Sequence, residues 1–524
     1  MPDDSLPFLG LRAVARRIAT GEVSPVEVVD ATLEWVGALE PGLNAFIWRN
    51  PRARHEAERA EQALQRRGAV GPLHGIPITI KDLILTRDAP TTAGSRIFGE
   101  GLRSRHDAPV VRRLRRAGAI LLGKTNLHEI AMGVTTVNEH FGPTRNPWDP
   151  TRVAGGSSGG SAAALAAGFG YGSVGTDTRG SIRIPAACCG VTGLKPTYGL
   201  VPTQDVIPLS WSLDHVGPMA RSVEDAAVLL GVMAGGRARR ERWLAAVDFA
   251  PERLRIGLCQ YYFRELDPAI EGSVAEAIAL FERAGHRLVD VELAGLTDAH
   301  AASAVITGAE AYAYHEEHLR ERPDGFGPLV RARLERAAAL TAVDLVRAER
   351  TRREIGAAFV GAFDAVDCLI GATVPAFPPR IGDATVRHGD REEPVLEAFT
   401  RLNSPQNMAG IPALVLPCGV GPDGLPVGLQ LIAAAGREDV LLALGAAYQR
   451  ETGWHSRTAR RRKALPSYVT GSLISAMRLP SESRKSPIHT SRSGSFATRC
   501  GASSNTTCRA LSSAAAAAMS STPK

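Results

Sequence analysis

The sequence lacks the features that mark exported, membrane-bound or metal-dependent proteins. Its seven cysteines form no CxxC pair, and no histidine stands at the spacing of a zinc ligand. The Met-Pro-Asp-Asp start has neither the basic residues nor the apolar stretch of a signal peptide. The uncharged stretch 153–176 is rich in glycine and serine, whereas a membrane span needs about 20 apolar residues. We therefore expect a cytoplasmic protein with reduced thiols, no membrane span, no metal and no cofactor.

Strong charge of one sign is also lacking. The net charge of +7 is spread over 524 residues, of which 22% are charged. The basic run 112–116 carries Val110, Val111 and Leu114 at helical spacing, which is typical of a solvated helix face. Nucleic acid is therefore not an expected partner. The 44% hydrophobic content is enough for a large core without disulfides.

Hydrophobic periodicity predicts helices and strands in mixed order. The segment 24–27 (Ser-Pro-Val-Glu) is a capping box that starts a helix, and 52–67 is a charged helix that ends at Gly68. Isoleucines at 76, 78 and 80 alternate with other residues, which predicts a strand ending at Lys81. The same reasoning predicts helices at 110–117 and 162–167, strands at 119–122, 413–416 and 428–432, and long helices between 221 and 395. This order indicates one α/β domain.

Two motifs suggest other enzymes but stand in the wrong context. Residues 118–125 match the phosphate-binding pattern GxxxxGK[ST], yet a basic helix precedes them and the intervening residues are apolar, as in a strand. Residues 155–159 match the GxSxG nucleophile elbow of α/β-hydrolases, yet the turn-rich 146–150 precedes them and no HGGG segment is present. A nucleotide hydrolase is rejected, and an α/β-hydrolase esterase is kept as a second alternative.

Two glycine- and serine-rich segments follow each other closely. The first, 155–160, contains Ser157, and the second, 175–183, contains Ser181. Flexible linkers rarely alternate with strands and short helices in this way. The sequence therefore predicts that two serines are held in position.

Together with Gly75-Ile-Pro-Ile-Thr-Ile-Lys-Asp82, these segments resemble the amidase-signature family. The resemblance extends over roughly residues 8 to 455 and includes further matching segments at 123–127, 146–148, 193–197, 407–412 and 417–419. It implies a single large domain with a central mixed sheet flanked by helices on both faces. We expect a helical N-terminal segment (1–70) packing on the core, a catalytic domain (71–455, with the signature core at about 71–220) and a disordered low-complexity tail (465–524).

The resemblance also implies a Ser-Ser-Lys triad. Ser181 is the expected nucleophile, Ser157 the proton relay and Lys81 the base, which must lose its charge through burial. A cis peptide bond is expected between Gly156 and Ser157. Ser158, Asp177 and Arg183 are expected to support the site, as is Gly156.

An oxyanion hole is expected at four backbone N–H groups. They belong to Thr178, Arg179, Gly180 and Ser181, and the resemblance alone assigns them. Many family members have glycine where this chain has Arg179. If the backbone there has a positive φ, the arginine is strained, and its side chain could instead shape the pocket.

The expected activity is hydrolysis of a carboxylic amide through a seryl acyl-enzyme. The expected partner is a small-molecule amide, and a homodimer is one candidate assembly. The first alternative is the glutamine-hydrolysing subunit of a tRNA-dependent glutamine amidotransferase, which delivers ammonia to partner subunits. That type of subunit typically has an aspartate where this chain has Thr400, and a Gly-Tyr-Tyr-Asp segment after an Arg-Arg pair, where Arg352 and Arg353 are here followed by Glu-Ile-Gly-Ala. These differences favour a free-standing amidase.

Overall fold

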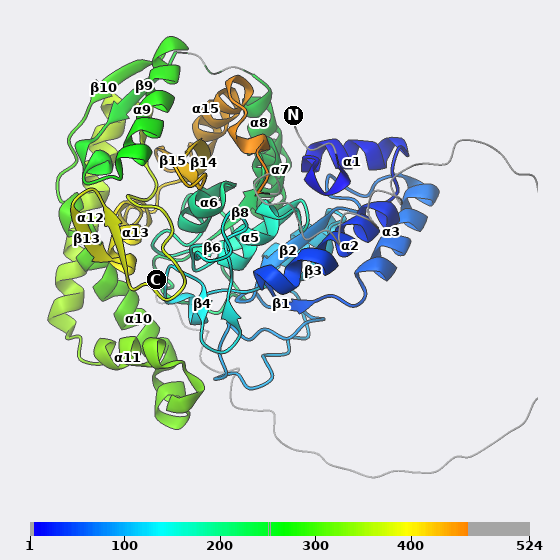
Figure 1. Ribbon diagram of the computed structural model, residues 1–524, viewed down its shortest axis with the longest axis horizontal. Coiled ribbons are helices and arrows are strands. Elements are labelled where there is room, and N and C mark those ends of the chain that lie inside the picture. The colour runs from blue at the N-terminus through cyan, green and yellow to red at the C-terminus, as the bar shows by residue number, and fades with distance from the viewer. Residues whose placement is uncertain (1–4, 250, 252, 460–524) are drawn as a thin grey trace, which may run out of the picture. The chain divides into compact units, whose positions relative to one another are not determined.

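An eleven-stranded sheet organises the chain (Figure 1). The computed structural model describes residues 5–249, 251 and 253–459. The strands lie in the order β1-β3-β2-β6-β8-β7-β14-β15-β11-β9-β10. Their bounds are β1 Phe46–Arg49, β2 Pro77–Lys81, β3 Ile120–Thr125, β6 Gly172–Asp177, β7 Thr192–Lys195, β8 His215–Ala220, β9 Arg255–Leu258, β10 Arg287–Asp290, β11 Cys368–Ala372, β14 Ala413–Val420 and β15 Pro426–Ile432.

Besides the sheet, the described part of the chain contains fifteen α-helices, six short 3₁₀ helices and two small hairpins. The hairpins pair β4 (Val137–Asn138) with β5 (Gly142–Pro143), and β12 (Thr385–His388) with β13 (Arg391–Pro394). The helices are α1 Leu11–Thr20, α2 Pro25–Leu43, α3 Ala53–Arg67, α4 Pro109–Arg116, α5 Gly159–Ala166, α6 Arg183–Cys189, α7 Val223–Ala234, α8 Arg237–Asp248, α9 Pro268–Arg283, α10 Ala299–Glu321, α11 Pro328–Ala337, α12 Ala342–Ala365, α13 Val395–Arg401, α14 Ser404–Met408 and α15 Glu438–Glu451.

The sheet is mixed, as expected. β3, β2 and β6 are parallel neighbours next to the antiparallel edge strand β1, and β11, β9 and β10 are parallel neighbours at the other end. The strands between them pair antiparallel. Because β2 and β6 are parallel, their carboxyl ends lie at the same edge of the sheet, and Lys81 and Asp177 are the last residues of these two strands.

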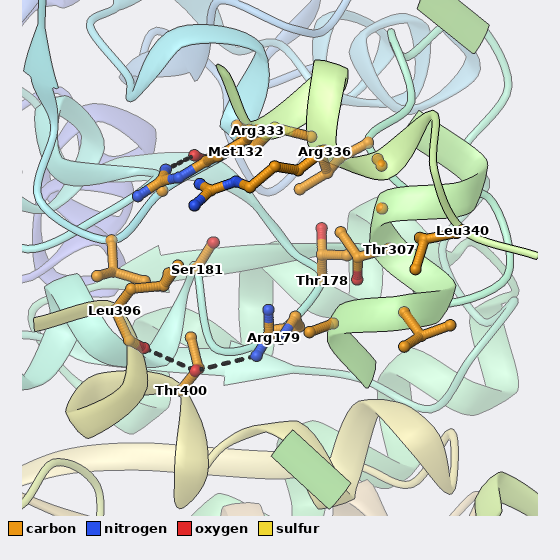
Figure 2. A pocket seen from close by; sticks show the side chains of 18 residues that line it. Met132, Thr178, Arg179, Ser181, Thr307, Arg333, Arg336, Leu340, Leu396 and Thr400 are labelled. Carbon is orange, nitrogen blue, oxygen red and sulfur yellow. Dashed lines mark hydrogen bonds between the residues drawn. The ribbon is translucent and has the colours of Figure 1, made fainter. Parts of the chain in front are cut away.

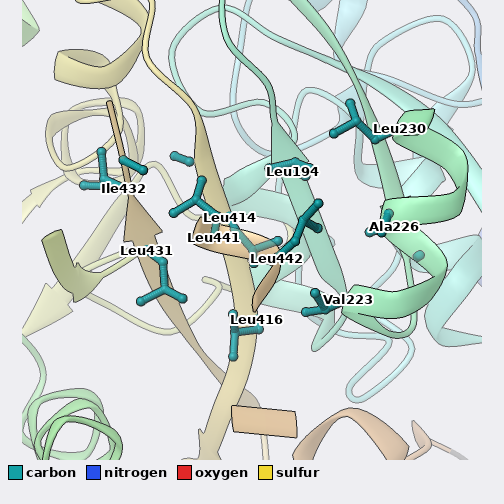
Figure 3. Close-up of a cluster of buried hydrophobic side chains, with 14 of the residues drawn as sticks. Leu194, Val223, Ala226, Leu230, Leu414, Leu416, Leu431, Ile432, Leu441 and Leu442 are labelled. Atoms are coloured by element: carbon teal, nitrogen blue, oxygen red, sulfur yellow. The ribbon is translucent and has the colours of Figure 1, made fainter. Parts of the chain in front are cut away.

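Helices cover both faces of the sheet, and β14 shows why. Its side chains alternate between the two faces. Leu414 and Leu416 pack in one cluster with side chains of α7 and α15, such as Val223 and Leu441 (Figure 3). Val415 lies in a different cluster, with residues of α5 and α6. Burial on both faces explains why the late strands are almost continuously apolar.

The N-terminal segment differs from the expectation in one respect. The capping box is present, since Ser24 Oγ accepts from Glu27 N at 3.1 Å and Glu27 Oε2 accepts from Ser24 N at 2.7 Å. However, the segment is not purely helical, because β1 pairs antiparallel with β3 and forms an edge of the sheet. A four-residue strand is too short for its hydrophobic pattern to be recognised.

All described residues belong to one compact unit, so the boundary expected near residue 70 separates no independent unit. The tail expected at 465–524 lies outside the described residues. Within residues 5–459, gaps aside, no helix combines the length and apolarity needed to cross a membrane.

Candidate active site

Lys81 is brought next to the first serine of the Ser-Ser pair. It is the last residue of β2 and is fully buried. Its Nζ donates to Ser157 Oγ and to Thr176 Oγ1, each at 2.7 Å. Thr176 is on β6, the parallel neighbour of β2. The sheet register therefore sets one of the two contacts of the lysine, and the loop before α5 supplies the other.

The surroundings of Lys81 favour its neutral form. Burial lowers the pKa of Lys81 to about 7, because the ammonium loses its hydration. The carboxylates of Asp214 and Asp177 act in the opposite direction, since they attract the charged form. The two hydroxyls that contact Nζ carry no charge. A substantial share of Lys81 is therefore a neutral amine near pH 7.

Thr136 holds the loop that carries Ser157. Its Oγ1 donates to the carbonyl of Gly155 at 2.8 Å and accepts from Gly159 N at 3.0 Å. A Cβ at Gly156 would lie 2.8 Å from Thr136 Oγ1 and 2.9 Å from the Thr135 nitrogen, so glycine is needed for this close approach. The Gly156–Ser157 peptide bond is cis, as the resemblance implies.

Ser158 connects the two serine segments. Its backbone N–H donates to the carbonyl of Ser181 at 3.2 Å. Its hydroxyl donates to the carbonyl of Thr176 at 3.2 Å and accepts from the Thr176 N–H at 3.3 Å. Ser158 thus holds the two expected catalytic serines on neighbouring loops.

A buried ion pair shapes the loop before Ser181. The carboxylate of Asp177 accepts from Arg183 Nε at 3.0 Å and from the backbone N–H of Gly180 at 2.8 Å and of Ile182 at 3.1 Å. Both charged side chains are fully buried. Burial alone would raise the pKa of Asp177, but the Arg183 guanidinium holds it well below its usual range.

The expected oxyanion hole needs two corrections. The Gly180 N–H donates to Asp177 and is therefore not free for an oxyanion. Arg179 does not have a positive φ; the glycine conformation falls on Gly180, at φ +115°, so the arginine is not strained. The N–H groups of Thr178, Arg179 and Ser181 donate no hydrogen bond to any described residue and remain free.

Ser181 lies on the wall of a cavity of about 330 Å³ (Figure 2). The residue is buried, with 5% of its surface exposed. No described hydrogen bond joins the hydroxyls of Ser181 and Ser157, so the second link of the expected relay is not formed in this structure. The cavity is lined by Ala131, Met132, Gly133, Val134, Thr178, Arg179, Ser181, Leu209, Ala304, Val305, Thr307, Gly308, Arg333, Arg336, Ala337, Leu340, Leu396 and Thr400.

Asp214 is a site residue that no local sequence pattern singles out. Its Oδ1 accepts from Thr178 Oγ1 at 2.6 Å, and its Oδ2 accepts from the backbone N–H of Leu209 at 2.9 Å and of Ser210 at 3.0 Å. Burial raises the pKa of Asp214 to about 6, and the charge of Lys81 acts against this rise. Asp214 thus links the loop before Ser181 to the electrostatics of Lys81.

The nucleotide-binding motif has a structural role. The predicted strand at 119–122 is observed as β3, at residues 120–125, and Lys124 Nζ lies 2.9 Å from Asp82 Oδ1 with both side chains fully buried. Cys188 and Cys189 are also buried, and burial raises the pKa of Cys188 to about 12, so it is protonated at neutral pH. In the part of the chain that the structure describes, no cluster of three or more potential metal ligands is found.

A family model described as Amidase matches residues 27–442, which is more than half of the chain. The chain belongs to the amidase family. Lys81, Ser157 and Ser181 all lie within the matched residues. Family membership excludes the α/β-hydrolase alternative, and the Ser157 hydroxyl contacts a lysine rather than the histidine that a GxSxG elbow requires.

This member of the amidase family has named relatives of two kinds. It is 42% identical to a subunit of the glutamyl-tRNA(Gln) amidotransferase of Chloroflexus aurantiacus, over 87% of this chain and 99% of that one. A crystal structure described as an amidase is similar at 36% identity and a TM-score of 0.79, covering 85% of this chain and all of the other. A chain of a solved protein complex, described as vestigial and as revealing the evolutionary origins of an s-triazine catabolic enzyme, is similar at 36% identity and a TM-score of 0.81, covering 84% of this chain and 98% of the other.

Proposed function

We propose that this chain hydrolyses a carboxylic amide through an acyl-enzyme formed on Ser181. The contact that carries the proposal is the 2.7 Å hydrogen bond from Lys81 to Ser157, made by a lysine whose pKa burial lowers to about 7. A serine hydroxyl needs a base that is neutral at working pH, and Lys81 meets this condition. Ser181 is the serine on the adjoining loop that also faces the cavity.

In the proposed reaction, Lys81 accepts a proton from Ser157 while Ser157 accepts one from Ser181. Ser181 Oγ then attacks the amide carbonyl. The negative charge on the carbonyl oxygen is stabilised by the free N–H groups of Thr178, Arg179 and Ser181. The proton returns to the leaving nitrogen, and water cleaves the acyl-enzyme by the same proton path. The missing Ser157–Ser181 hydrogen bond is of the kind that is often long without substrate and shortens when substrate binds.

A second candidate, the glutamine-hydrolysing subunit of an amidotransferase, is favoured by the 42% identity to a subunit of glutamyl-tRNA(Gln) amidotransferase. It would imply partner subunits and glutamine as the amide. One feature of the site supports the free-standing amidase instead. Thr400, at the position where those subunits typically carry aspartate, lines the cavity.

The nucleophile can be tested without knowing the substrate. Phenylmethanesulfonyl fluoride sulfonylates serines that a nearby base activates, and mass spectrometry of peptides then identifies the labelled residue. We expect labelling of Ser181 in the wild type, none in Ser181→Ala, and slow labelling in Lys81→Ala. Ser210→Ala, another buried serine of the described chain, is the matched control and should keep the label at Ser181. Labelling elsewhere, or equal rates with and without Lys81, contradicts the proposal.

A further inference from the structure

Three arginines line the cavity without an acidic partner. They are Arg179, from the loop before Ser181, and Arg333 and Arg336, from α11. No aspartate or glutamate is among the lining residues. Within the described residues, none of the three arginines forms an ion pair. In the view of Figure 2, Arg333 and Arg336 lie on one side of Ser181, and Arg179 and Thr400 lie on the other.

The three guanidinium groups differ in how firmly they are held. Arg179 donates to His300 Nδ1 at 3.0 Å and to Thr400 Oγ1 at 3.2 Å. Arg333 donates to the carbonyl of Met132. Arg336 is an exposed residue at the edge of the cavity, and its guanidinium donates to no described residue. Of the three arginines, Arg336 therefore has the most N–H donors without a protein partner, and Arg333 also has some.

The arginines repel one another. Burial and the charge of Arg333 lower the pKa of Arg179 to about 10, and burial and the charge of Arg336 lower the pKa of Arg333. The acids that oppose these shifts, Glu397 and Glu139, are exposed and lie outside the cavity lining. A bound anion would relieve this repulsion in a partly enclosed space, where its contacts are stronger than in water.

We propose that the amide substrate carries a carboxylate, which Arg333 and Arg336 bind while Ser181 attacks the amide carbonyl. This inference rests on the proposed function of the same site. A guanidinium fork matches the two oxygens of a carboxylate. The remaining wall, with Met132, Leu209 and Leu340 among its residues, is apolar and suits a short aliphatic chain between the two groups.

The same cavity does not favour a substrate ammonium group. Thr400 Oγ1 accepts from Arg179 and donates to the carbonyl of Leu396 at 2.7 Å, so its hydroxyl is already used. No lining residue carries a negative charge. We therefore expect the substrate to be an ω-amide of a dicarboxylic acid without an α-amino group, which distinguishes it from glutamine.

Three amides of one chain length test the proposal. Glutaramate carries a carboxylate, glutaramide replaces it by a neutral group of the same shape, and glutamine adds an α-ammonium to glutaramate. We expect kcat/KM for glutaramate to exceed that for either of the others by roughly tenfold or more, as for a charged hydrogen bond in a partly buried site. Succinamate and succinamide, compared in the same way, cover a shorter chain.

Arginine variants test whether the cavity arginines cause the preference for glutaramate over glutaramide. Arg336→Gln should lower kcat/KM for glutaramate by roughly tenfold more than it lowers kcat/KM for glutaramide. Arg331→Gln is the matched control, because Arg331 is on the same helix but pairs with Asp324 and does not line the cavity. It should leave both substrates unchanged. Calorimetry with Ser181→Ala measures binding of glutaramate and glutaramide without turnover and should show the same preference.

The outcomes separate this inference from the proposed function. If the sulfonyl fluoride labels Ser181 but glutaramate is neither hydrolysed nor bound better than glutaramide, the carboxylate site is wrong and the nucleophile stands. A preference for glutamine over glutaramate also overturns the inference, since it requires an ammonium site. If Ser181 is not labelled and glutaramate still binds in preference to glutaramide, the carboxylate site stands and the nucleophile is wrong.

Discussion

At the scale of single residues, the proposed chemistry depends on the burial of Lys81, which lowers its pKa. Lys81 has no carboxylate in contact with Nζ, and its two partners are hydroxyls. Asp177 and Asp214 are close enough to act on its charge but do not offset the effect of burial. Lys81 is thus buried without an ion-pair partner and has a pKa near 7, which suits the proposed role as a base.

This arrangement predicts a pH dependence. Lys81 acts as base only when neutral, so kcat/KM should rise with pH through an apparent pKa near 7, well below that of free lysine. Lys81→Ala should lower kcat/KM by about 10²- to 10⁴-fold and remove this ascending limb from the residual rate. Initial rates from about pH 5 to 9 at constant ionic strength measure both effects. An ascending limb that persists unchanged in Lys81→Ala would assign the base to another group.

The sequence identifies the residues proposed to carry the reaction more readily than those proposed to adjust it. Lys81, Ser157 and Ser181 stand within recognisable segments, because the glycines around them are needed for close backbone approaches such as that of Gly156 to Thr136. Asp214, Arg333 and Arg336 stand in no such segment. Their proposed roles rest on contacts between elements more than 30 residues apart, which no local sequence pattern indicates.

At the scale of elements, the loop from Thr178 to Ser181 is held from two sides. Asp177 fixes its Gly180 N–H, and Asp214 fixes the Thr178 hydroxyl. Arg179 is not strained, because the positive φ of this turn falls on Gly180, whose N–H donates to the Asp177 carboxylate. A resemblance in sequence does not predict which residue has the positive φ, because this depends on which backbone N–H donates to the Asp177 carboxylate.

Asp214→Asn tests whether the Asp214 carboxylate also affects the pKa of Lys81. The Asp214 carboxylate raises the pKa of Lys81, so removing its charge should lower that pKa further. The ascending limb of kcat/KM should therefore move to lower pH, while asparagine keeps an acceptor for Thr178. Glu310→Gln is the matched control. Glu310 is a neighbouring acid that accepts from the Ser210 hydroxyl, and its replacement should leave the ascending limb at the same pH. A limb that moves to higher pH in Asp214→Asn would reverse the assigned electrostatics.

Elements with strong periodicity are predicted from the sequence, and those set by distant partners are not. The strands at 413–416 and 428–432 and the helix ending at Gly68 are confirmed within a few residues. β1 is missed because four residues give too short a pattern. The strand order is also not predicted from the sequence, because it depends on which apolar faces meet in the folded chain.

At the scale of the whole molecule, one buried ion pair connects the signature region to the C-terminal part of the fold. Arg183 pairs with Asp177 at the end of β6 and also donates to the carbonyl of Asn403 at 2.9 Å. Asn407 on α14 donates through Nδ2 to the Asp177 carboxylate at 3.0 Å. Both asparagines are more than 200 residues from the ion pair in the sequence, so the pair holds the site together only in the complete fold.

Asp177→Ala should therefore lower the stability of the whole chain. It leaves the Arg183 guanidinium fully buried without its carboxylate, which typically costs about 3 to 5 kcal/mol in the free energy of unfolding. Urea unfolding at about pH 7 measures this. Glu354→Ala, which breaks the exposed Arg350–Glu354 pair, is the matched control and should cause no measurable change.

Because the folded pKa of Asp177 is held low, its contribution to stability is complete above the unfolded pKa of about 3.9 and is lost as pH falls below it. The difference between wild type and Asp177→Ala should accordingly shrink below about pH 4, and a difference that grows there would contradict the assigned charge.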